Sequence, residues 1–334
     1  MENYTYKAYE ITETANGSFE RNITTKNTSE LPQNGTLIKV AYSSLNYKDA
    51  LSATGNKGVT RKYPFTPGVD AAGVVVATDS PILKPGDNVL VTGFDLGMNT
   101  CGGFGEYINV PCEWVIPLPY NLSLMESMAL GTAGFTAGLS MLQLLRFGQT
   151  KEQGPLLVTG ATGGVGSVAV AIAAKLGFVV GASTSKMDKA DYLKTLGASE
   201  IIARGALEVE NNKGLLRPQW GGAIDTVGGN TLSNVLKSTF PQGNVTTCGN
   251  VSSTQLNTTI FPFILNGVNL LGINSASTPM RNRTEVWKHL STDWKPDFEK
   301  LELKVVPLHE IGEYIDKILK GKISGRVVIK HEDN

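Results

Sequence analysis

One stretch of the chain constrains the fold more than any other: LLVTGATGGVGSVAVAIAAKLGFVVGASTSK, from Leu156 to Lys186. An apolar strand pattern ends at the glycine-rich turn 161–166, ATGGVG, which opens an apolar helix that leads to a second apolar strand. Glycines in such a turn let the backbone approach a pyrophosphate, and the N–H groups at the helix N-terminus bind it. Strand, turn, helix and strand together predict a dinucleotide-binding unit, although Ala161 replaces the first glycine of GxGxxG. A turn that serves only close helix–strand packing is the alternative.

The end of the second strand indicates which dinucleotide is bound. NAD enzymes place Asp or Glu there, roughly 20 residues on, to hold the ribose 2′-hydroxyl, and this carboxylate would repel a 2′-phosphate. This chain instead has Ser183, Thr184, Ser185 and Lys186, whose hydroxyls and ammonium suit a phosphate dianion. We therefore infer NADPH, with Ser183, Ser185 and Lys186 at the 2′-phosphate. Asp188 just beyond weighs against this, and a solvated lysine at a helix start is the alternative for Lys186.

The pattern of predicted elements changes at Leu124. From about residue 4 to 120, short strands such as TLIKVAYSS and DAAGVVVAT alternate with Pro-Gly turns, which is typical of a small antiparallel barrel or sandwich. After Leu124 a long helical stretch is followed by alternating strands and helices, which predicts βαβ units and a parallel, doubly wound sheet. The fold class is therefore α/β. The segment from about residue 275 onward cannot be assigned to either part by pattern alone.

Composition excludes several classes of partner. Thirty basic and thirty acidic residues give no net charge, so no global field favours nucleic acid or an anionic membrane. Cys101, Cys112 and Cys248 are too far apart for a disulfide framework or a CxxC metal site, which fits a reducing compartment. The N-terminus, MENYTYKAYE, has no signal-peptide pattern. We expect a cytoplasmic protein with a small-molecule substrate, with neither nucleic acid nor membrane as a partner.

A small β domain followed by a doubly wound cofactor domain resembles the medium-chain dehydrogenase/reductase superfamily over essentially the whole chain. Zinc alcohol dehydrogenases of that superfamily carry a GHE motif, whereas this chain has PGVDAAGVV, with Val69 at the position of the ligand histidine. The lobe with four closely spaced cysteines is also missing, and no histidine has an i, i+4 partner. We therefore predict no metal. Without one to polarise an alcohol, reduction of an activated double bond or a quinone is the expected reaction class.

Several longer matches resemble the zinc-free YhdH/YhfP family of quinone oxidoreductases, to which NADPH-dependent acryloyl-CoA reductases belong. They are SSLNYKDALSATGN, PGVDAAGVV, GGFGEY, VTGATGGVGSVAV, DTVGG, PFILNGVNLLGINS and GRVVIK. The resemblance implies a GroES-like catalytic domain, residues 1–123 together with 275–334, and a Rossmann NADPH-binding domain, residues 124–274. It also implies a homodimer.

The same resemblance implies the catalytic residues. In the family's N-x-x-D pattern, Asn46 and Asp49 face the nicotinamide, with Tyr47 and Lys48 between them. Reduction of an unsaturated thioester delivers hydride to the β-carbon and a proton to the α-carbon, and the enolate needs hydrogen-bond donors. Asn46 is expected to orient the substrate or donate to the enolate, and Tyr47 is a proton donor or a packed core tyrosine. Asp49 and, on the substrate side, Asp70 are candidates that have turn capping as the alternative.

The cofactor contacts implied by the resemblance follow the turn and the later strand ends: Thr162, Gly163, Gly164, Val165, Gly166, Asn250, Ile273, Asn274, Ser275 and Arg326. Arg283, after STPM, resembles a family arginine and would meet a phosphate of NADPH or CoA, or else lie on the surface. Thr278 departs from the commoner CPM, so the thioester end of the site is less defined.

Two alternatives remain open at this point. A quinone, enone or unsaturated aldehyde reductase would use the same hydride chemistry without a CoA groove, although the loop GNKGVTRKYP offers Lys57, Arg61 and Lys62 to an anionic tail. A non-catalytic NADPH-binding sensor would keep the fold without the reaction. The acyl chain length, the proton donor, the direction of the reaction and the oligomeric state are not readable from one sequence.

Overall fold

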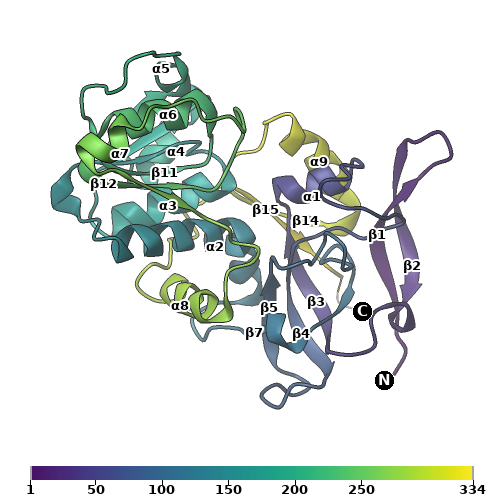
Figure 1. The fold of residues 1–334 in the computed structure, drawn as a ribbon. Helices are drawn as coiled ribbons and strands as arrows, with labels where there is room; N and C mark the ends of the chain where they lie inside the picture. The colour runs from purple at the N-terminus through teal and green to yellow at the C-terminus, as the bar shows by residue number, and fades with distance from the viewer. Residues whose placement is uncertain (1, 333–334) are drawn as a thin grey trace. The chain divides into compact units, whose positions relative to one another are not determined.

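The structure is a computed structural model that describes residues 2–332, and the chain divides into two compact units. Unit 1 contains the chain up to Thr132, the segment Ala276–Thr284 and the chain from Glu302 on. Unit 2 contains Ala133–Ser275 and Glu285–Leu301. Figure 1 shows the C-terminal elements β14, β15 and α9 among strands from the N-terminal part of the chain, which explains why sequence pattern alone does not assign this segment.

Unit 1 is built on a seven-stranded sheet with the order β14-β15-β3-β4-β5-β7, and β6 also pairs with β3. Neighbouring strands are antiparallel except β14 and β15, which are parallel. A separate hairpin, β1 and β2, and the helices α1 and α9 complete the unit. The bounds are β1 Thr5–Glu13, β2 Phe19–Asn27, β3 Thr36–Ser44, α1 Tyr47–Ser52, β4 Asp70–Thr78, β5 Asn88–Thr92, β6 Tyr107–Val110, β7 Ile116–Pro117, β14 Leu303–Pro307, α9 Ile311–Leu319 and β15 Arg326–Lys330.

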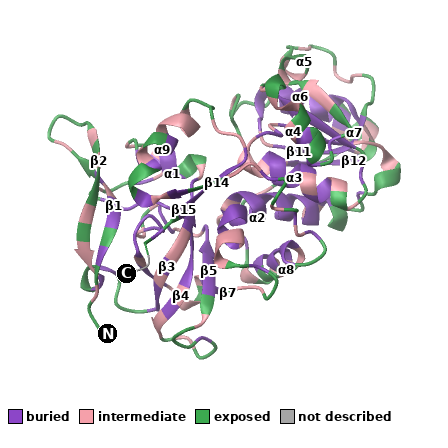
Figure 2. Cartoon of the chain, turned by 180° about the vertical axis from the view of Figure 1, so that it is seen from behind, coloured by how far each residue is buried: buried purple, intermediate pink, exposed green. Residues whose placement is uncertain are grey.

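Several apolar clusters form the core of unit 1, and two of them are large (Figure 2). One joins α1 and α9 to the hairpin and the C-terminal strands through residues such as Ile11, Leu45 and Ile315. The other fills the sheet around Val40, Val89 and Ile108. The C-terminal strand β15 pairs with the end of β3, with Val328 opposite Ser44, and this register brings Arg326 to the same end of β3.

Unit 2 contains a six-stranded parallel sheet with the order β10-β9-β8-β11-β12-β13. The chain begins at β8, adds β9 and β10 on one side, and then continues with β11, β12 and β13 on the other, so the topological switch point lies between β8 and β11. This confirms the predicted doubly wound sheet. The bounds are β8 Leu156–Val158, α3 Gly164–Lys175, β9 Val180–Thr184, α4 Ala190–Thr195, β10 Glu200–Ala203, α5 Arg204–Glu208, β11 Trp220–Asp225, α6 Gly229–Lys237, β12 Thr239–Thr247, α7 Phe261–Asn266 and β13 Asn269–Gly272.

Two helices, α2 (Leu124–Arg146) and α8 (Met280–Leu290), contain residues of both units. Helix α2 is interrupted at Gly131, whose φ of 52° and ψ of −155° are not helical. By length and composition α2 is apolar enough to cross a membrane, but 83% of its most apolar window is buried. A buried core helix of a folded protein meets the same criterion, so this finding does not indicate a membrane span.

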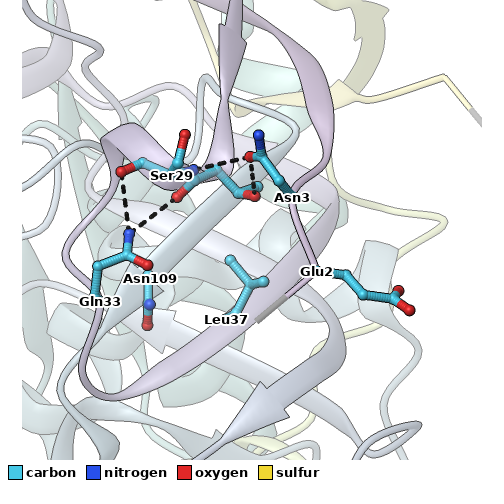
Figure 3. A pocket seen from close by; sticks show the side chains of 7 residues that line it. Glu2, Asn3, Ser29, Gln33, Leu37 and Asn109 are labelled. Carbon is cyan, nitrogen blue, oxygen red and sulfur yellow. Dashed lines mark hydrogen bonds between the residues drawn. The ribbon is translucent and has the colours of Figure 1, made fainter.

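A small cavity of about 30 Å³ lies beside the hairpin, lined by Glu2, Asn3, Thr28, Ser29, Gln33, Leu37 and Asn109 (Figure 3). It has room for no more than a few water molecules. The Oδ1 atom of Asn109 is buried and has no hydrogen-bond partner in the protein, while its Nδ2 donates to the Pro32 carbonyl at 2.6 Å. A single bound water would satisfy this oxygen, and the cavity is too small for a substrate.

Candidate functional site

The turn between β3 and α1 carries the predicted N-x-x-D residues. Asn46 has extended backbone angles and caps α1, and the backbone N–H of Asn46 donates to Asp49 Oδ2 at 2.8 Å. A residue at the third helical position that reaches back to the cap in this way is a capping-box contact. Asp49 Oδ1 accepts from the backbone N–H of Val69 at 2.8 Å, so the same carboxylate also ties the helix start to the residue before β4.

Asp70, the first residue of β4, is fully buried and accepts hydrogen bonds on both oxygens. Oδ2 accepts from Ser44 Oγ at 2.5 Å and from Asn46 Nδ2 at 2.7 Å. Thr132 closes the other side, because its backbone N–H lies 2.9 Å from both oxygens and its hydroxyl donates to Oδ1 at 2.6 Å. Asp70 therefore holds three segments of unit 1 together and has no exposed oxygen for a substrate, which corrects its prediction as a substrate residue.

Arg326, the first residue of β15, supplies the positive charge of this network and is 3% exposed. Its Nη2 donates to Ser44 Oγ at 2.8 Å and its Nε to the Ala129 carbonyl at 3.0 Å, while Nη1 lies 3.4 Å from Asn46 Oδ1. The resemblance predicted a cofactor contact for this arginine. The structure instead directs its guanidinium to buried groups of unit 1, where it acts on Asn46 through Oδ1 and on Asp70 through Ser44. We call Asn46, Asp49, Asp70 and Arg326, with Ser44 and Thr132, the buried polar network.

The buried polar network determines how the Asn46 amide is oriented. Its Nδ2 faces the two carboxylates, at 2.7 Å from Asp70 and 3.3 Å from Asp49, and its Oδ1 faces the guanidinium of Arg326. The opposite orientation would place an amide oxygen against two carboxylates. Because both hydrogens of Nδ2 are directed at buried acceptors, Asn46 offers a bound molecule an acceptor and not a donor. This corrects the expectation that Asn46 donates to the enolate.

The buried carboxylate of Asp49, which shares Asn46 with Asp70, has a shifted ionisation. Burial, and then the negative charge of Asp70, raise the pKa of Asp49 to about 7, although hydrogen bonds from Asn46 and Val69 partly oppose the shift. The folded protein therefore keeps on Asp49 a proton that the unfolded chain releases near pH 4. The stability contributed by Asp49 falls as pH rises from about 4 to 7, and the charge beside Asn46 changes near neutral pH.

Tyr47 differs from its neighbours because its side chain is 54% exposed. A packed core tyrosine is therefore excluded, and the phenol is accessible to a bound molecule in a way that Asp49 and Asp70 are not. Lys48, the next residue, is also exposed.

Arg283 has neither of its predicted roles. It is fully buried, and its guanidinium donates to three backbone carbonyls: Thr278 O at 2.9 Å, Thr92 O at 2.7 Å and Ala276 O at 2.7 Å. It also lies over the ring of Phe94, 4.0 Å from the ring centroid. Burial lowers its pKa to about 10. Arg283 therefore anchors the segment 276–284 to the end of β5, and it is neither a surface residue nor accessible to a phosphate.

In unit 2 the glycine-rich turn has the geometry that a pyrophosphate requires. Gly163 caps α3, which begins at Gly164, and the first N–H groups of a helix have no partner within it. A Cβ on Gly166 would lie 2.3 Å from the Gly160 carbonyl oxygen, so only glycine allows this close approach. The Thr162 hydroxyl lies 3.0 Å from the Thr184 hydroxyl, which joins the turn to the end of β9. These residues fit a dinucleotide.

The residues predicted for the 2′-phosphate differ in accessibility. Ser183 is fully buried, so its hydroxyl is not available to a phosphate. This hydroxyl also has no hydrogen-bond partner in the protein. Ser185 is exposed and Lys186 is half-buried, and the backbone N–H of Lys186 donates to the Thr184 hydroxyl at 3.0 Å. Strand β9 is buried along its whole length, whereas Ser185 and Lys186 follow its end. Only these two of the three predicted phosphate ligands remain candidates.

The other predicted cofactor residues follow the carboxyl ends of parallel strands. Asn250 is exposed and follows β12, and residues 273–275 follow β13, with the Ile273 N–H bound to the Thr247 carbonyl at 3.0 Å. The carboxyl ends of parallel strands lie at one edge of the sheet, where the glycine-rich turn also lies. Unit 2 thus collects Thr162–Gly166, Lys186, Asn250 and residues 273–275 at one edge, while Asn46 and the buried polar network belong to unit 1.

Sequence reasoning missed three members of the site. Ser44 and Thr132 carry no motif, and their roles depend on contacts with Asp70. Gly131 is one of three glycines in the helical stretch 124–146, with Gly134 and Gly138, so the sequence does not show which of them interrupts the helix. Within residues 2–332, no group of three or more His, Cys, Asp or Glu side chains is arranged to hold a metal.

A buried histidine makes the stability of unit 1 depend on pH. His331 is 3% exposed, Nε2 lies 2.8 Å from the Gly103 carbonyl, and Nδ1 has no partner in the protein. Burial lowers its pKa to about 4, whereas the unfolded chain protonates this histidine near pH 6.5. Stability should therefore be lost as pH falls from 6.5 to 4, by roughly 3 kcal/mol in total.

We expect urea unfolding at pH 7.5, 6 and 5 to show this loss when wild type is compared with His331→Gln, in which the amide can still donate to Gly103. The difference in unfolding free energy between the two proteins should shrink, or change sign, toward pH 5. Parallel pH curves would show that His331 does not titrate in this way.

Comparison with known proteins agrees with this architecture. The family model described as "Alcohol dehydrogenase GroES-like domain" matches residues 32–120, and the one described as "Zinc-binding dehydrogenase" matches residues 164–292. The chain is 46% identical to YhfP of Bacillus subtilis over 92% of this chain and 94% of YhfP, whose name describes it, provisionally, as a quinone oxidoreductase. It is 42% identical to "Acrylyl-CoA reductase AcuI" of Ruegeria pomeroyi, over 90% of this chain and 91% of AcuI.

Solved structures show the same relationship. YhfP with NAD bound superposes with a TM-score of 0.95 at 43% identity, covering 98% of this chain and 99% of YhfP. The YhdH oxidoreductase from Salmonella enterica in complex with NADP superposes with a TM-score of 0.94 at 37% identity, covering 98% of this chain and all of YhdH. The predicted fold class, the family and the class of enzyme are thereby confirmed. The chain belongs to the medium-chain dehydrogenase/reductase superfamily, in the zinc-free family of YhfP, YhdH and AcuI, and is an NADPH-dependent oxidoreductase.

Proposed function

We propose that this protein uses NADPH to reduce the C=C bond of a short α,β-unsaturated acyl-CoA such as acryloyl-CoA. The observation that carries the proposal is the buried polar network, which holds Asn46 in one orientation beside the exposed Tyr47. The identity of 42% to an acrylyl-CoA reductase over nine-tenths of the chain supports the substrate class. In this proposal unit 1 is the catalytic domain and unit 2 binds the cofactor.

NADPH supplies a hydride to the β-carbon, and the α-carbon takes a proton, so that the C=C bond becomes a single bond. In unit 1, Tyr47 is the exposed hydroxyl next to Asn46, and we assign it the donation of a hydrogen bond or proton to the substrate. Asn46 Oδ1 accepts a hydrogen bond and so orients the bound molecules. Asp70 and Arg326 hold Asn46 in this orientation, and Asp49 sets the charge beside it.

A quinone is the second candidate substrate, and one observation favours it. Lys57, in the basic loop considered for a CoA phosphate, pairs with Glu13 at 2.5 Å and lies 4.8 Å from the centroid of the Tyr63 ring. Its positive charge is therefore already paired with a carboxylate of the protein, which weakens the case that it binds a CoA phosphate. Arg61 and Lys62 remain exposed in that loop. The provisional name of YhfP is consistent with a quinone substrate.

A parallel assay separates these substrates. NADPH oxidation would be followed by absorbance with acryloyl-CoA, crotonoyl-CoA and a soluble quinone, each with NADH as the control cofactor. A high kcat/KM with acryloyl-CoA and only weak quinone turnover is the expected result. Turnover of the quinone alone would overturn the enoyl-thioester proposal while leaving the enzyme class intact.

The preference for NADPH is expected to depend on Lys186. Replacing Lys186 by alanine removes the one cation predicted at the 2′-phosphate, so KM for NADPH should rise about tenfold, with little change in KM for NADH. The matched control is Lys84→Ala, an exposed lysine of unit 1. Equal effects on both cofactors would show that Lys186 does not recognise the 2′-phosphate. The relative YhfP was solved with NAD, so NADH is an informative second cofactor.

We also propose that the protein is a homodimer that uses the free edge of the unit 2 sheet. Strand β13 is the last strand of that sheet, and the adjacent helix α7 exposes Phe261, Ile264 and Leu265 by 45%, 64% and 63% (Figure 2). An edge strand beside exposed apolar residues favours pairing with another chain. Light scattering should give twice the chain mass for wild type and a lower mass for Ile264→Glu. Ile82→Glu, at an exposed position of unit 1, should not change the mass.

A further inference from the structure

Asp225, in the sequence DTVGG, is a buried carboxylate that the proposed mechanism does not use. It is the last residue of β11 and is fully buried. Burial is the largest cause of its raised pKa, and hydrogen bonds to the carboxylate oppose the shift. Within residues 2–332 no lysine or arginine forms an ion pair with it. A buried charge with no cation costs stability, so an additional role accounts better for its presence than packing does.

The carboxylate of Asp225 connects three strand ends. In the parallel register it lies opposite Thr247 at the end of β12, and its predecessor Ile224 lies opposite Val158 at the end of β8. Oδ1 accepts from the Thr159 hydroxyl at 2.7 Å, and Oδ2 accepts from the Thr247 hydroxyl at 3.3 Å. Oδ2 also accepts from the Gly228 N–H at 2.9 Å, which fixes the exit turn of β11.

Thr159 passes this constraint to the glycine-rich turn. The Thr159 hydroxyl donates a hydrogen bond to Asp225, and its oxygen accepts one from the Thr226 N–H at 3.0 Å. The Thr226 hydroxyl donates in return to the Thr159 carbonyl at 2.9 Å. The next residue, Gly160, has a φ of +60°, and a Cβ there would lie 2.2 Å from the Thr226 hydroxyl oxygen.

Gly160 in turn sets the shape of the cofactor turn. Its carbonyl accepts from the Gly163 N–H at 2.9 Å and is the atom that a Cβ on Gly166 would meet at 2.3 Å. The contacts therefore run from Asp225 through Thr159 and Gly160 to the N-terminus of α3. Thr159 and Gly160 are neighbours in the chain, and the other steps are hydrogen bonds or close backbone approaches within unit 2.

We propose that Asp225 is a positioning residue for the cofactor: through Thr159 it holds the glycine-rich turn in the conformation that binds the pyrophosphate of NADPH. The inference rests on the assignment of that turn as the NADPH site. Asparagine at position 225 cannot reproduce the contact, because an amide nitrogen would face either the Thr159 hydroxyl or the Gly228 N–H. In the first orientation the Thr159 hydroxyl loses its acceptor, and in the second the Gly228 N–H loses its acceptor, which releases the exit turn of β11.

The test is the affinity for NADPH measured by fluorescence titration of the substrate-free protein. Asp225→Asn and Thr159→Val should each weaken NADPH binding about tenfold, as expected for loss of a hydrogen bond to a charged group. The double variant should bind about as weakly as Asp225→Asn alone, because both changes break the same contact. Thr159→Ser, which keeps the hydroxyl, should bind as wild type does.

The control is Thr239→Val. Thr239 is a fully buried threonine at the start of β12, and its hydroxyl donates to the Val235 carbonyl at 2.7 Å. This variant should lower the thermal unfolding midpoint about as much as Thr159→Val, yet leave the NADPH affinity unchanged. Wild-type affinity in Thr159→Val, or losses that multiply in the double variant, would overturn the proposal. Since no acyl-CoA or quinone is present, the result is independent of which substrate is reduced.

Discussion

Replacing Gly131 by alanine is expected to destabilise the protein by about 3 kcal/mol or more and to abolish most of its activity. Gly131 has a φ of 52° and a ψ of −155°, a backbone conformation that residues other than glycine rarely adopt. A Cβ there would also lie 2.5 Å from Asp70 Oδ2, 2.5 Å from Ser44 Oγ and 2.9 Å from Arg326 Nη2. The added methyl group would therefore enter the centre of the buried polar network.

The loss of activity has a separate cause from the loss of stability. The break in α2 at Gly131 turns the Thr132 N–H and hydroxyl toward Asp70, and Asp70 in turn holds Asn46. A displaced Asp70 would release the Asn46 amide. Urea unfolding measures the first effect, and kcat of the folded variant at low temperature measures the second.

Gly86→Ala is the matched control for the backbone strain. Gly86 also lies in unit 1 and has a φ of +92°, but a Cβ there would have no atom within 4 Å. We expect a loss of about 1 kcal/mol, from the positive φ alone, with kcat unchanged. If the two alanine variants lost equal stability, the contact with the buried polar network would not be the reason for glycine at position 131.

Replacing Arg326 by methionine should cost about 3 to 5 kcal/mol, because it leaves the carboxylates of Asp49 and Asp70 buried without their cation. Methionine fills a similar volume and donates no hydrogen bond. The Ala129 carbonyl, the Ser44 hydroxyl and Asn46 Oδ1 would all lose a donor. Unfolding by urea at pH 7.5 measures the loss.

The pH dependence identifies the electrostatic part of this effect. The positive charge of Arg326 opposes protonation of Asp49, whose pKa is already raised to about 7, so its removal raises that pKa further. A raised carboxyl pKa destabilises the folded protein at high pH, where the unfolded chain has released the proton. Arg326→Met should therefore lose more stability at pH 8 than at pH 5, and a pH-independent loss would contradict this account.

Two further variants test the pairing. Adding Asp70→Asn to Arg326→Met removes the unpaired charge, and the double variant should be more stable than the sum of the two single losses predicts. Arg21→Met is the surface control: Arg21 and Asp316 form a partly exposed ion pair at 2.9 Å, with side chains 28% and 49% exposed. That pair should contribute at most about 1 kcal/mol.

Features that depend on neighbours in the chain were predictable. The glycine-rich turn and the alternation of strands and helices predicted the doubly wound sheet, because apolar periodicity and turn residues act over a few positions. The family resemblance placed Asn46 and Asp49 at one site, and in the structure their contact is a helix-capping interaction three residues apart. NADPH was inferred from residues 183–186, and the structures of relatives with NADP support it.

Features that depend on burial were mispredicted. Ser183 was assigned to a phosphate because hydroxyl groups suit a phosphate dianion, and Arg283 because it resembles a family arginine, yet both side chains are fully buried. A hydroxyl and a guanidinium group can both bind an anion, but the residue type does not show whether the side chain faces solvent. Arg326 was placed at the cofactor by the family resemblance, and Asp70 was a substrate-side candidate with turn capping as the alternative; the structure makes both of them internal partners of Asn46.

By itself, the sequence determined the two kinds of domain, the dinucleotide turn and the family, since these follow from local patterns that recur wherever such segments fold. Only the tertiary structure decided how the site is assembled. Arg326 reaches Ser44 across 282 positions of sequence, Thr132 reaches Asp70 across 62, and Thr159 reaches Asp225 across 66. Strand pairing and the break in α2 bring these groups together. Burial then shifts the pKa values of Asp49, Asp225 and Arg326, because a charge removed from water depends on the few groups that remain in contact with it.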